Sequence, residues 1–332
     1  MRAITPRRAA IGVALVVLAA LPTWVGNPYY INVSSQILLF AIFALALNVL
    51  VGYGGLVSLG HAGLFATAGY AAALLLQAGY GHLAAAAFAI LVTVAAAAVF
   101  GVLALRSTGI GFLMITLALG QIVWGVAYRW AGLTNGDNGI NVTTRPRPFG
   151  LSLASADSFY YATLVIFLAA LVSMTVFIRS PFGASLRGTR DQARRMNALG
   201  YNVWLIRFLA FLFSGFWSAA AGLLFIYYTN FISPQVAALQ TSAEALLMVI
   251  SGGTATLLGP IAGAAIVVIT KNVVSAYIER WNLVLGVIFV AIITFMPEGL
   301  VPGSVRVWRM GWRALRERTR GGVLRDLPEP PA

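Results

Sequence analysis

The chain has no cysteine, one lysine and two histidines among its 332 residues. Without cysteine it can form no disulfide, thiolate nucleophile or iron–sulfur ligand. The histidines, His61 and His82, belong to no His/Asp/Glu cluster with metal-ligand spacing, so we expect no metal site. A P-loop needs Gly-Lys-Ser/Thr, but Lys271 follows Thr270 instead of glycine. We therefore expect no cofactor in this chain and no catalysis by it, and energy must come from another subunit or from a gradient.

Charge is also scarce. Only 9% of the residues are charged and 60% are hydrophobic, whereas an ordinary soluble domain is about a quarter charged. Apolar runs such as 83–105 and 159–178 are as long as the stretch of about 20 residues that a helix needs to cross the hydrocarbon. The alternation of a transmembrane β-barrel is absent. The composition nearly excludes a water-soluble fold and predicts an all-α membrane protein with many crossings.

Apolar windows bounded by charges and turn residues predict about ten crossings. The predicted crossings are 9–26, 33–52, 57–78, 83–105, 109–130, 159–179, 203–229, 240–258, 260–279 and 283–300. The first could be a cleavable signal peptide, but it lacks a small-residue cleavage site before Asn27, which favours a retained span. The third, eighth and ninth are rich in glycine and joined by tight turns, so we expect some of them to be broken or re-entrant.

The net charge of +13 comes from 21 arginines and one lysine against nine acidic residues. Such a balance could indicate nucleic-acid binding, but its distribution fits membrane topology better. With ten spans, 17 basic residues fall on the side of the termini and of the connection 180–202, and five fall on the other side. The positive-inside rule therefore predicts that both termini and this connection are cytoplasmic.

Two connections are long enough to hold structure of their own. The outer one, 131–158, is rich in Asn, Gly and Pro and is either an ordered cap or a flexible gate. The inner one, 180–202, predicts a short amphipathic helix that reaches Leu199 and stops at Gly200. Its polar face carries Arg187, Arg190, Arg194 and Arg195. This helix either lies on anionic lipid or docks a soluble partner, and periodicity alone leaves both open.

Polar residues inside the spans are the candidates for a transport path, because each is costly in hydrocarbon. They are Asn48, Ser58, His61, Thr67, Thr116, Gln121, Glu244 and Thr256. For the hydroxyls and amides, hydrogen bonding between helices is the commoner role. Glu244 is either an acid at a helix N-terminus near the outer surface or an inward carboxylate that lines the path or pairs with a neighbouring subunit. His61 is either a structural histidine bonded to backbone or part of a proton relay.

Two glycine-rich patches indicate close helix approach and unwound backbone. Their structural glycines are Gly52, Gly55, Gly60, Gly252, Gly253 and Gly259. The patches are faintly alike and lie about 200 residues apart, which indicates a duplicated unit with the path between its halves. We expect the transmembrane domain to span 1–305. A basic cytoplasmic tail, 306–332, places Trp308 and Trp312 at the membrane face and ends in a disordered stretch.

Several separated motifs occur in an order that resembles one known family, the inner-membrane permease subunit of branched-chain amino-acid ABC importers. Together they extend over roughly residues 35–302. The motifs are Leu47–Ala62 (LNVLVGYGGLVSLGHA), Ile115–Ala118 (ITLA), Thr134–Gly139 (TNGDNG), Ser180–Gly183 (SPFG) with Arg187, Arg190 and Asp191, Ala198–Gly200 (ALG), Glu244–Gly253 (EALLMVISGG), Leu258–Pro260 (LGP) and Pro297–Leu300 (PEGL). Any one of them is weak, whereas the ordered set is specific.

The resemblance implies a permease of the bacterial inner membrane that works with four other subunits. These are a second permease, two ATP-binding subunits that hold ATP and Mg, and an external substrate-binding protein. It implies that 181–200 is the coupling helix, which fits into a groove of an ATP-binding subunit. The residues it assigns to coupling are Arg187, Arg190, Asp191, Arg194, Arg195, Ala198, Leu199 and Gly200. The family often has acidic residues where this chain has Arg194, Arg195 and Asn197.

The cargo implied by the resemblance is a branched-chain or related amino acid, or a small amide such as urea. A rival interpretation from another class is a secondary transporter or channel that works alone. Such a protein would need charges in the membrane, and the spans offer few besides Glu244 and Lys271. A membrane-bound enzyme is less favoured still, because the sequence has no paired carboxylates, nucleophile–base pair or metal set.

Overall fold

The computed structural model describes residues 18–24, 26–142, 155–277, 281–296, 298–304 and 306. Helices make up nearly all of these residues, which confirms the all-α class. The main helices are α2 (Pro28–Asn48), α3 (His61–Gln77), α4 (His82–Ala104), α5 (Ile110–Arg129), α7 (Ala156–Arg179), α8 (Pro181–Ala198), α9 (Val203–Thr229), α10 (Leu239–Gly252), α11 (Gly259–Ile269) and α12 (Trp281–Phe295). Two π-helical turns, η1 (Val49–Gly54) and η5 (Thr270–Val274), continue α2 and α11.

Short elements lie in the connections around residues 131–141 and 231–237. Two-residue strands β1 (Ile140–Asn141) and β2 (Phe231–Ile232) pair antiparallel. Next to them lie α6 (Ala131–Thr134) and the 3₁₀ turn η4 (Pro234–Ala237). The strand pair joins the start of the outer connection to the end of α9, so part of the predicted cap is ordered. Residues 143–154 of this connection lie outside the described residues.

Among the described residues, five helices are long and apolar enough to cross a membrane. They are Pro28–Gly54, His82–Ala104, Ile110–Arg129, Ala156–Arg179 and Val203–Thr229. The predicted crossings 57–78, 240–258, 260–279 and 283–300 also contain helices, but these are shorter: α3 has 17 residues and α10 has 14. The glycine-rich third, eighth and ninth segments are among these short ones. The count of ten crossings stays a prediction, and most of the first span, 9–26, and of the tail, 306–332, lies outside the described residues.

Local backbone chemistry explains where the predicted boundaries were wrong. The helix expected at 33–52 already begins at Pro28, because the Asn27 side chain accepts from Tyr29 N and proline suits the first helical position. The helix expected at 57–78 begins only at His61. The helix expected at 240–258 ends at Gly252, since Gly253 adopts a φ of 117° that a right-handed helix cannot continue.

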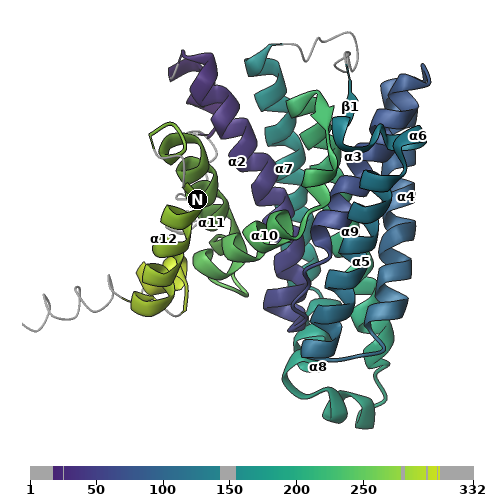
Figure 1. Ribbon diagram of the computed structural model, residues 1–332. Helices are drawn as coiled ribbons and strands as arrows, with labels where there is room; N and C mark the ends of the chain where they lie inside the picture. Colours follow the sequence, from purple (N-terminus) through teal and green to yellow (C-terminus); the bar gives the residue numbers. More distant parts are fainter. Residues whose placement is uncertain are drawn as a thin grey trace, which may run out of the picture.

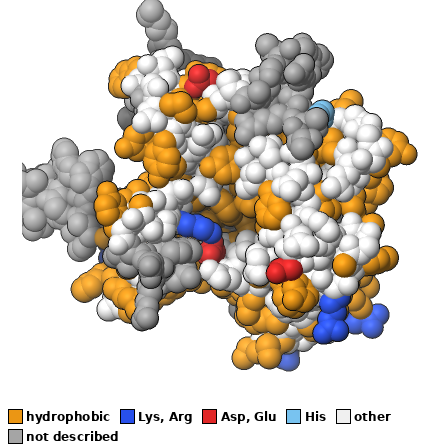
Figure 2. Space-filling view, turned by 45° about the horizontal axis from the view of Figure 1, so that its top comes forward, with side chains coloured by type: hydrophobic (Ala, Val, Ile, Leu, Met, Phe, Trp, Pro, Cys, Tyr) orange, Lys and Arg blue, Asp and Glu red, His pale blue; other side chains and the backbone are white. Residues whose placement is uncertain are grey.

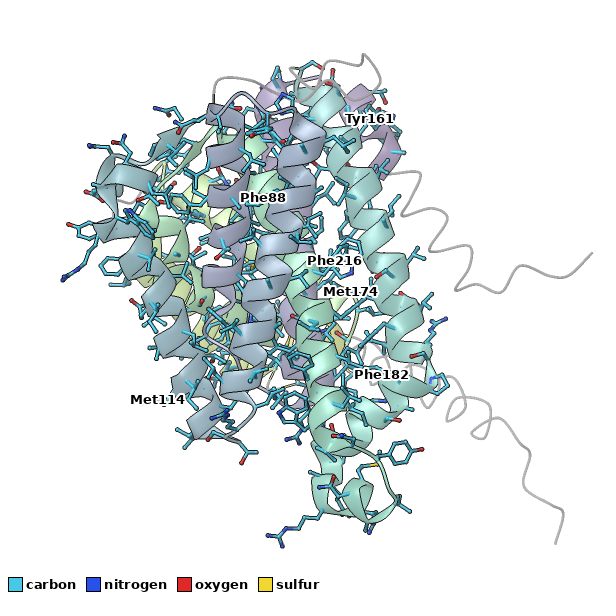
Figure 3. The ribbon with its side chains drawn as sticks, turned by 90° about the vertical axis from the view of Figure 1, so that its right-hand side faces the viewer. Phe88, Met114, Tyr161, Met174, Phe182 and Phe216 are labelled. Carbon is cyan, nitrogen blue, oxygen red and sulfur yellow. The ribbon has the colours of Figure 1, made fainter. Side chains whose placement is uncertain are left out.

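The helix α2 is the centre of the bundle. In its most apolar window 89% of the residues are buried, against 22% in α5 and 33% in α7. A helix that is apolar all round and enclosed on all sides is a core helix. The outer helices instead expose large apolar side chains: Phe88 on α4, Tyr161 on α7 and Phe216 on α9 lie along the face in Figure 3. Such a surface fits lipid.

The connections lie at opposite ends of the bundle. In Figure 1, β1 and α6 are at the upper end and α8 is at the lower end, while α2, α4, α5, α7 and α9 run between the two. The helix α10 lies across the middle instead of along the others. The two long connections therefore face opposite sides of any membrane that the bundle spans, as the sequence predicts, and which side is cytoplasmic stays a prediction.

Two stretches of the chain repeat the same order of elements. A helix is followed by a glycine with positive φ, then by two more helices: α2, Gly55, α3 and α4 in one stretch, and α10, Gly253, α11 and α12 in the other. The two glycines are 198 residues apart (253 − 55), as are the first residues of α3 and α11 (259 − 61). The first residues of α4 and α12 are 199 apart (281 − 82). These spacings match the predicted offset of about 200 residues, and the duplication itself stays a prediction.

Candidate transport path and coupling surface

Asn48 ties the end of α2 to the loop between α10 and α11. Its Nδ2 donates to the Thr256 carbonyl oxygen at 2.8 Å, and its Oδ1 accepts from Ala255 N at 3.2 Å. The Thr256 hydroxyl donates to the Gly253 carbonyl and accepts from Gly259 N, so it holds the loop and satisfies the first backbone amide of α11. Asn48 and Thr256, two predicted path residues, thus contact each other, and the side chains of both are hydrogen-bonded to backbone groups.

The glycines let these backbones approach. A Cβ on Gly52 would lie 2.3 Å from Asn48 Oδ1 and 2.4 Å from Ala255 N. A Cβ on Gly252 would lie 1.8 Å from the Gly259 carbonyl oxygen, which closes α10 and α11 into a tight hairpin. Gly253 lies against Pro302, so the turn after α12 packs on the same hairpin. Any side chain at these positions would force the elements apart.

His61 is enclosed and bonded through both ring nitrogens. Its Nδ1 and Nε2 lie 2.8 Å from the hydroxyls of Ser58 and Ser214, and Ser214 donates its proton to the Ala46 carbonyl at 2.6 Å. Ser214 must therefore accept from Nε2–H, and Ser58 donates to Nδ1; this tautomer is assigned from the network. The arrangement joins α2, α3 and α9, and it satisfies a neutral ring completely.

A backbone amide in the first turn of α3 is hydrogen-bonded by a serine of α10 that the sequence did not single out. The Ser242 hydroxyl on α10 accepts from Ala62 N at 3.0 Å, which satisfies one of the amides that a helix start leaves unpaired. Ser214 and Ser242 are both buried polar residues within predicted spans, so polarity inside an apolar window was the signal that could have found them. Their partners lie more than 150 residues away in the chain.

Thr116 and Gln121 on α5 have different surroundings. The Thr116 hydroxyl accepts from Leu59 N at 3.2 Å and donates to the Leu113 carbonyl. A Cβ on Gly60 would lie 2.4 Å from the Thr116 carbonyl oxygen, so the loop before α3 packs directly on α5. Gln121 is partly exposed and makes no hydrogen bond within the described residues. Thr67 donates to the Gly63 carbonyl of its own helix.

The predicted coupling helix is present as α8, but it is broken. Gln192 has non-helical dihedral angles (φ −150°, ψ 82°) inside it, so 181–191 and 193–198 are two helical pieces. The expectation of one continuous amphipathic helix was therefore wrong. Met196 folds back against Gly188, where a Cβ would lie 2.7 Å from its sulfur. Gly200, with a φ of 86°, lies just beyond the helix end and confirms the predicted stop.

The first piece of α8 packs on the bundle. Gly183, Leu186 and Thr189, three residues apart, are buried. Arg190 donates from Nη1 to the Gly52 carbonyl at the end of α2, and its stem lies against Gly55, which has a φ of 66°. Arg187 donates to the Ile178 carbonyl at 3.2 Å, and Arg207 of α9 donates to the Thr189 carbonyl at 2.7 Å. Two of the four arginines expected on a free polar face are thus hydrogen-bonded to the bundle itself.

The exposed tip, which we define as 191–200, runs from the last residue of the first piece of α8 through the second piece and the turn after it. Asp191, Arg194, Arg195, Ala198, Leu199 and Gly200 are all exposed. The Leu199 side chain is 66% exposed although it is a large apolar residue. The tip therefore offers charge and an apolar anchor with little contact to its own chain.

Glu244 and Lys271 form an ion pair between α10 and η5. Lys271 Nζ lies 3.4 Å from Glu244 Oε2, and Gln240 Nε2 donates to Glu244 Oε1 at 3.2 Å. Glu244 is in the second turn of α10, and the first turn carries no acid, so the interpretation as a helix N-terminal acid was wrong. Figure 2, viewed partly from the end that carries β1 and α6, shows a basic and an acidic side chain in contact at the edge of a hollow.

Amide side chains lie beside this pair. Asn272, next to Lys271 in η5, donates from Nδ2 to Gln36 Oε1 on α2 at 2.9 Å and to the Val268 carbonyl at 2.8 Å. We call Gln36, Gln240, Glu244, Lys271 and Asn272 the polar cluster. Among the described residues no group of three or more His, Asp or Glu side chains could hold a metal ion.

The sequence of this chain is similar to known proteins over most of its length. The family described as "Branched-chain amino acid transport system / permease component" matches residues 29–293. Over 313 residues the chain is 28% identical to the high-affinity branched-chain amino acid transport system permease protein LivM of Salmonella typhimurium, covering 87% of this chain and 74% of that protein. The protein of the same name from Escherichia coli is 28% identical over 314 residues, with the same shares, 87% and 74%.

A more distant relative is the probable branched-chain amino acid transport permease protein LivM of Methanocaldococcus jannaschii. It is 26% identical over 161 residues, which cover 43% of this chain and 46% of the relative. No solved structure matches the chain at a significant level.

Proposed function

Since this chain belongs to the family of permease components of branched-chain amino acid transport systems, we propose that it is the membrane-spanning subunit of an ATP-driven importer. Its cargo is a branched-chain or related amino acid, or a small amide such as urea, which it carries into the cytoplasm. Two separate subunits bind ATP and Mg and hydrolyse the nucleotide. A second, similar permease and an external substrate-binding protein complete the assembly in the bacterial inner membrane.

The observation that carries this proposal is the two-part structure of α8. Its first piece is fixed to the bundle, and its tip, 191–200, is exposed and projects beyond the ends of the membrane helices in Figure 1. A helix that rests on lipid would lie along the surface instead. A projecting tip with Arg194, Arg195 and the apolar Leu199 fits a groove on a soluble partner, which supports its role as the contact to an ATP-binding subunit.

A chain of contacts runs from this tip into the bundle. Arg190 links α8 to the Gly52 carbonyl at the end of α2, and Asn48, one helical turn earlier, links α2 to the loop between α10 and α11. Leu186 of α8 is fully buried and lies in van der Waals reach of Gly54. Movement of α8 by a closing ATPase would thus displace both the end of α2 and the α10–α11 hairpin. This is the kind of two-state element that an importer needs.

The proposal is tested by reversing the charge of the tip. Arg194→Glu and Arg195→Glu, made singly, should each weaken binding of the ATP-binding subunit about tenfold or more, because each replaces attraction at an interface with repulsion. Binding is measured by copurification from native membranes in mild detergent. Arg106→Glu is the matched control, since Arg106 is an exposed arginine in the turn between α4 and α5 at the same end of the bundle.

The same purification separates the proposal from its rival. A secondary transporter or channel would use the Glu244–Lys271 pair without any ATPase. A wild-type chain that copurifies with no ATP-binding subunit, and that transports with a gradient alone, would establish the rival. Retention of the ATP-binding subunit by both tip variants would instead contradict the assignment of the coupling surface.

A further inference from the structure

The Glu244–Lys271 pair is a costly feature for a membrane-spanning bundle. Charged side chains within such bundles are rare and mark sites of function. Stability alone does not explain them, because replacing a buried ion pair with apolar residues is often neutral or stabilising. The side chain of Glu244 is 10% exposed and that of Lys271 is 40% exposed. The carboxylate is thus largely desolvated, whereas the ammonium group remains accessible.

The ion pair is not a tight one. Its N···O distance is 3.4 Å, longer than the ~2.7–2.9 Å of a strong charge-assisted hydrogen bond. Lys271 stands in the π-helical turn η5, and such turns are frequent at functional sites. The two charges come from different elements, α10 and the end of α11, so a small shift of one against the other changes their separation.

The groups around the pair suit a small polar ligand with an aliphatic side chain. Gln240 donates to Glu244, and the Gln36–Asn272 bond lies beside Lys271. Leu247 is three residues after Glu244 and Val33 is three residues before Gln36, so each lies one helical turn from a polar member. Both are partly exposed apolar residues. The polar cluster thus combines one positive charge, one negative charge and amides, and two branched aliphatic residues lie one helical turn from its members.

We propose that the polar cluster is a binding site for the zwitterionic head of an amino acid during transport. The ammonium group of the ligand pairs with Glu244 and its carboxylate pairs with Lys271, so the ligand takes the place of each residue's partner. When the ligand leaves, the two side chains pair again, and neither charge is left uncompensated. This inference rests on the proposed function and names where the cargo is held.

The first test is ATP-dependent uptake of labelled leucine by the whole importer in proteoliposomes. Glu244→Gln and Lys271→Met should each lower uptake about tenfold or more, the effect of losing one charge-assisted contact. Hydrolysis of ATP stimulated by the binding protein should stay within about twofold, because the coupling tip is untouched. Asp157→Asn is the control: it neutralises an exposed acid in the first turn of α7, and uptake should not change.

A charge exchange distinguishes a binding site from a structural ion pair. The double variant Glu244→Lys with Lys271→Glu restores attraction between the two positions, so its thermal stability should recover relative to either single reversal. Uptake should stay low, because the reversed charges would bind the head group backwards and misplace the side chain. Recovery of uptake to the wild-type rate would show that the pair is only structural and would overturn the proposal.

A second readout uses the fact that Lys271 is the only lysine of the chain. Leucine should protect Lys271 from an amine-acylating reagent in the wild-type complex, as measured by mass spectrometry of the peptide that contains it. Leucinol has the same amine, so it consumes the reagent equally, but it has no carboxylate to pair with Lys271 and should protect much less. In the Glu244→Gln variant, leucine should no longer protect Lys271. Equal labelling with leucine and leucinol would contradict the site.

The outcomes separate this inference from the proposed function. If the wild-type importer takes up leucine with ATP while both neutralised variants do so at the wild-type rate, the binding site is wrong and the proposed function stands. If the wild-type assembly takes up only a small amide such as urea with ATP, the amino-acid site is wrong and the proposed function stands. If it shows no ATP-dependent uptake of any amino acid or small amide, both fail together.

Discussion

Asn48 and Thr256 are 208 residues apart in the sequence, yet the side-chain amide of the first donates to the backbone carbonyl of the second at 2.8 Å. The same side chain accepts from Ala255 N. A single buried side chain thus satisfies two backbone groups of an irregular loop, where water is excluded. This contact joins the two glycine-rich patches, which the sequence showed only as similar to each other.

Replacing Asn48 should destabilise the fold. Asn48→Leu keeps the approximate volume but leaves the Thr256 carbonyl and the Ala255 amide without a partner, at a cost of about 1–3 kcal/mol for each group. We expect a clear fall in the thermal unfolding temperature of the purified chain in detergent. Gln121→Leu, on a side chain without hydrogen bonds in the described structure, should change it little. Equal effects of the two changes would contradict the role of Asn48.

Gly52→Ala tests the close approach at the same place. The new methyl group would collide with Asn48 Oδ1 and Ala255 N, so the α10–α11 loop must shift, at a cost of about 1–3 kcal/mol. Gly125→Ala is the matched control, because no heavy atom lies within 4 Å of its would-be Cβ. Since alanine is the better helix former, the control should be neutral or slightly stabilising. Thermal unfolding of both variants checks the prediction.

His61→Phe separates a structural histidine from a proton relay. The ring still fills space, but Ser58 and Ser214 lose their partner at the imidazole, which should cost about 1–3 kcal/mol in the free energy of unfolding. Less folded protein should reach the membrane, while transport per folded molecule stays the same. His82→Phe, at a partly exposed ring 3.4 Å from the Tyr227 hydroxyl, is the control. A loss of transport in well-folded His61→Phe would support the relay instead.

Arg190→Met separates docking from transmission. The methionine keeps an apolar stem against Gly55 and removes the hydrogen bond to the Gly52 carbonyl. The ATP-binding subunit should stay bound and active, because the tip residues are unchanged, but uptake per ATP hydrolysed should fall about tenfold, the value of one charged hydrogen bond. Arg187→Met removes a hydrogen bond that joins only α7 and α8, which are neighbours in the sequence. Its effect on uptake per ATP should therefore be smaller. The ratio of uptake to hydrolysis measures both.

Part of the site could be predicted from the sequence and part could not. The polarity of Asn48, His61 and Glu244 within apolar windows singled them out, and all three are buried and hydrogen-bonded in the structure. Their role in a transport path stays a prediction. Their partners were not predictable, because Thr256, Ser214 and Lys271 come from distant segments whose approach depends on packing. The break of α8 at Gln192 also escaped the periodicity, since the fold-back of Met196 onto Gly188 outweighs local helix propensity.

The sequence by itself determined the class of protein, the helical state of its segments and the stop of α8 at Gly200. These properties are local: the transfer of about 20 apolar residues into lipid and the backbone freedom of a single glycine are settled within a few turns of chain. Only the tertiary structure decided which polar groups meet. A buried donor must find an acceptor somewhere, and whether Asn48 finds Thr256 or Glu244 finds Lys271 depends on how helices distant in sequence pack together.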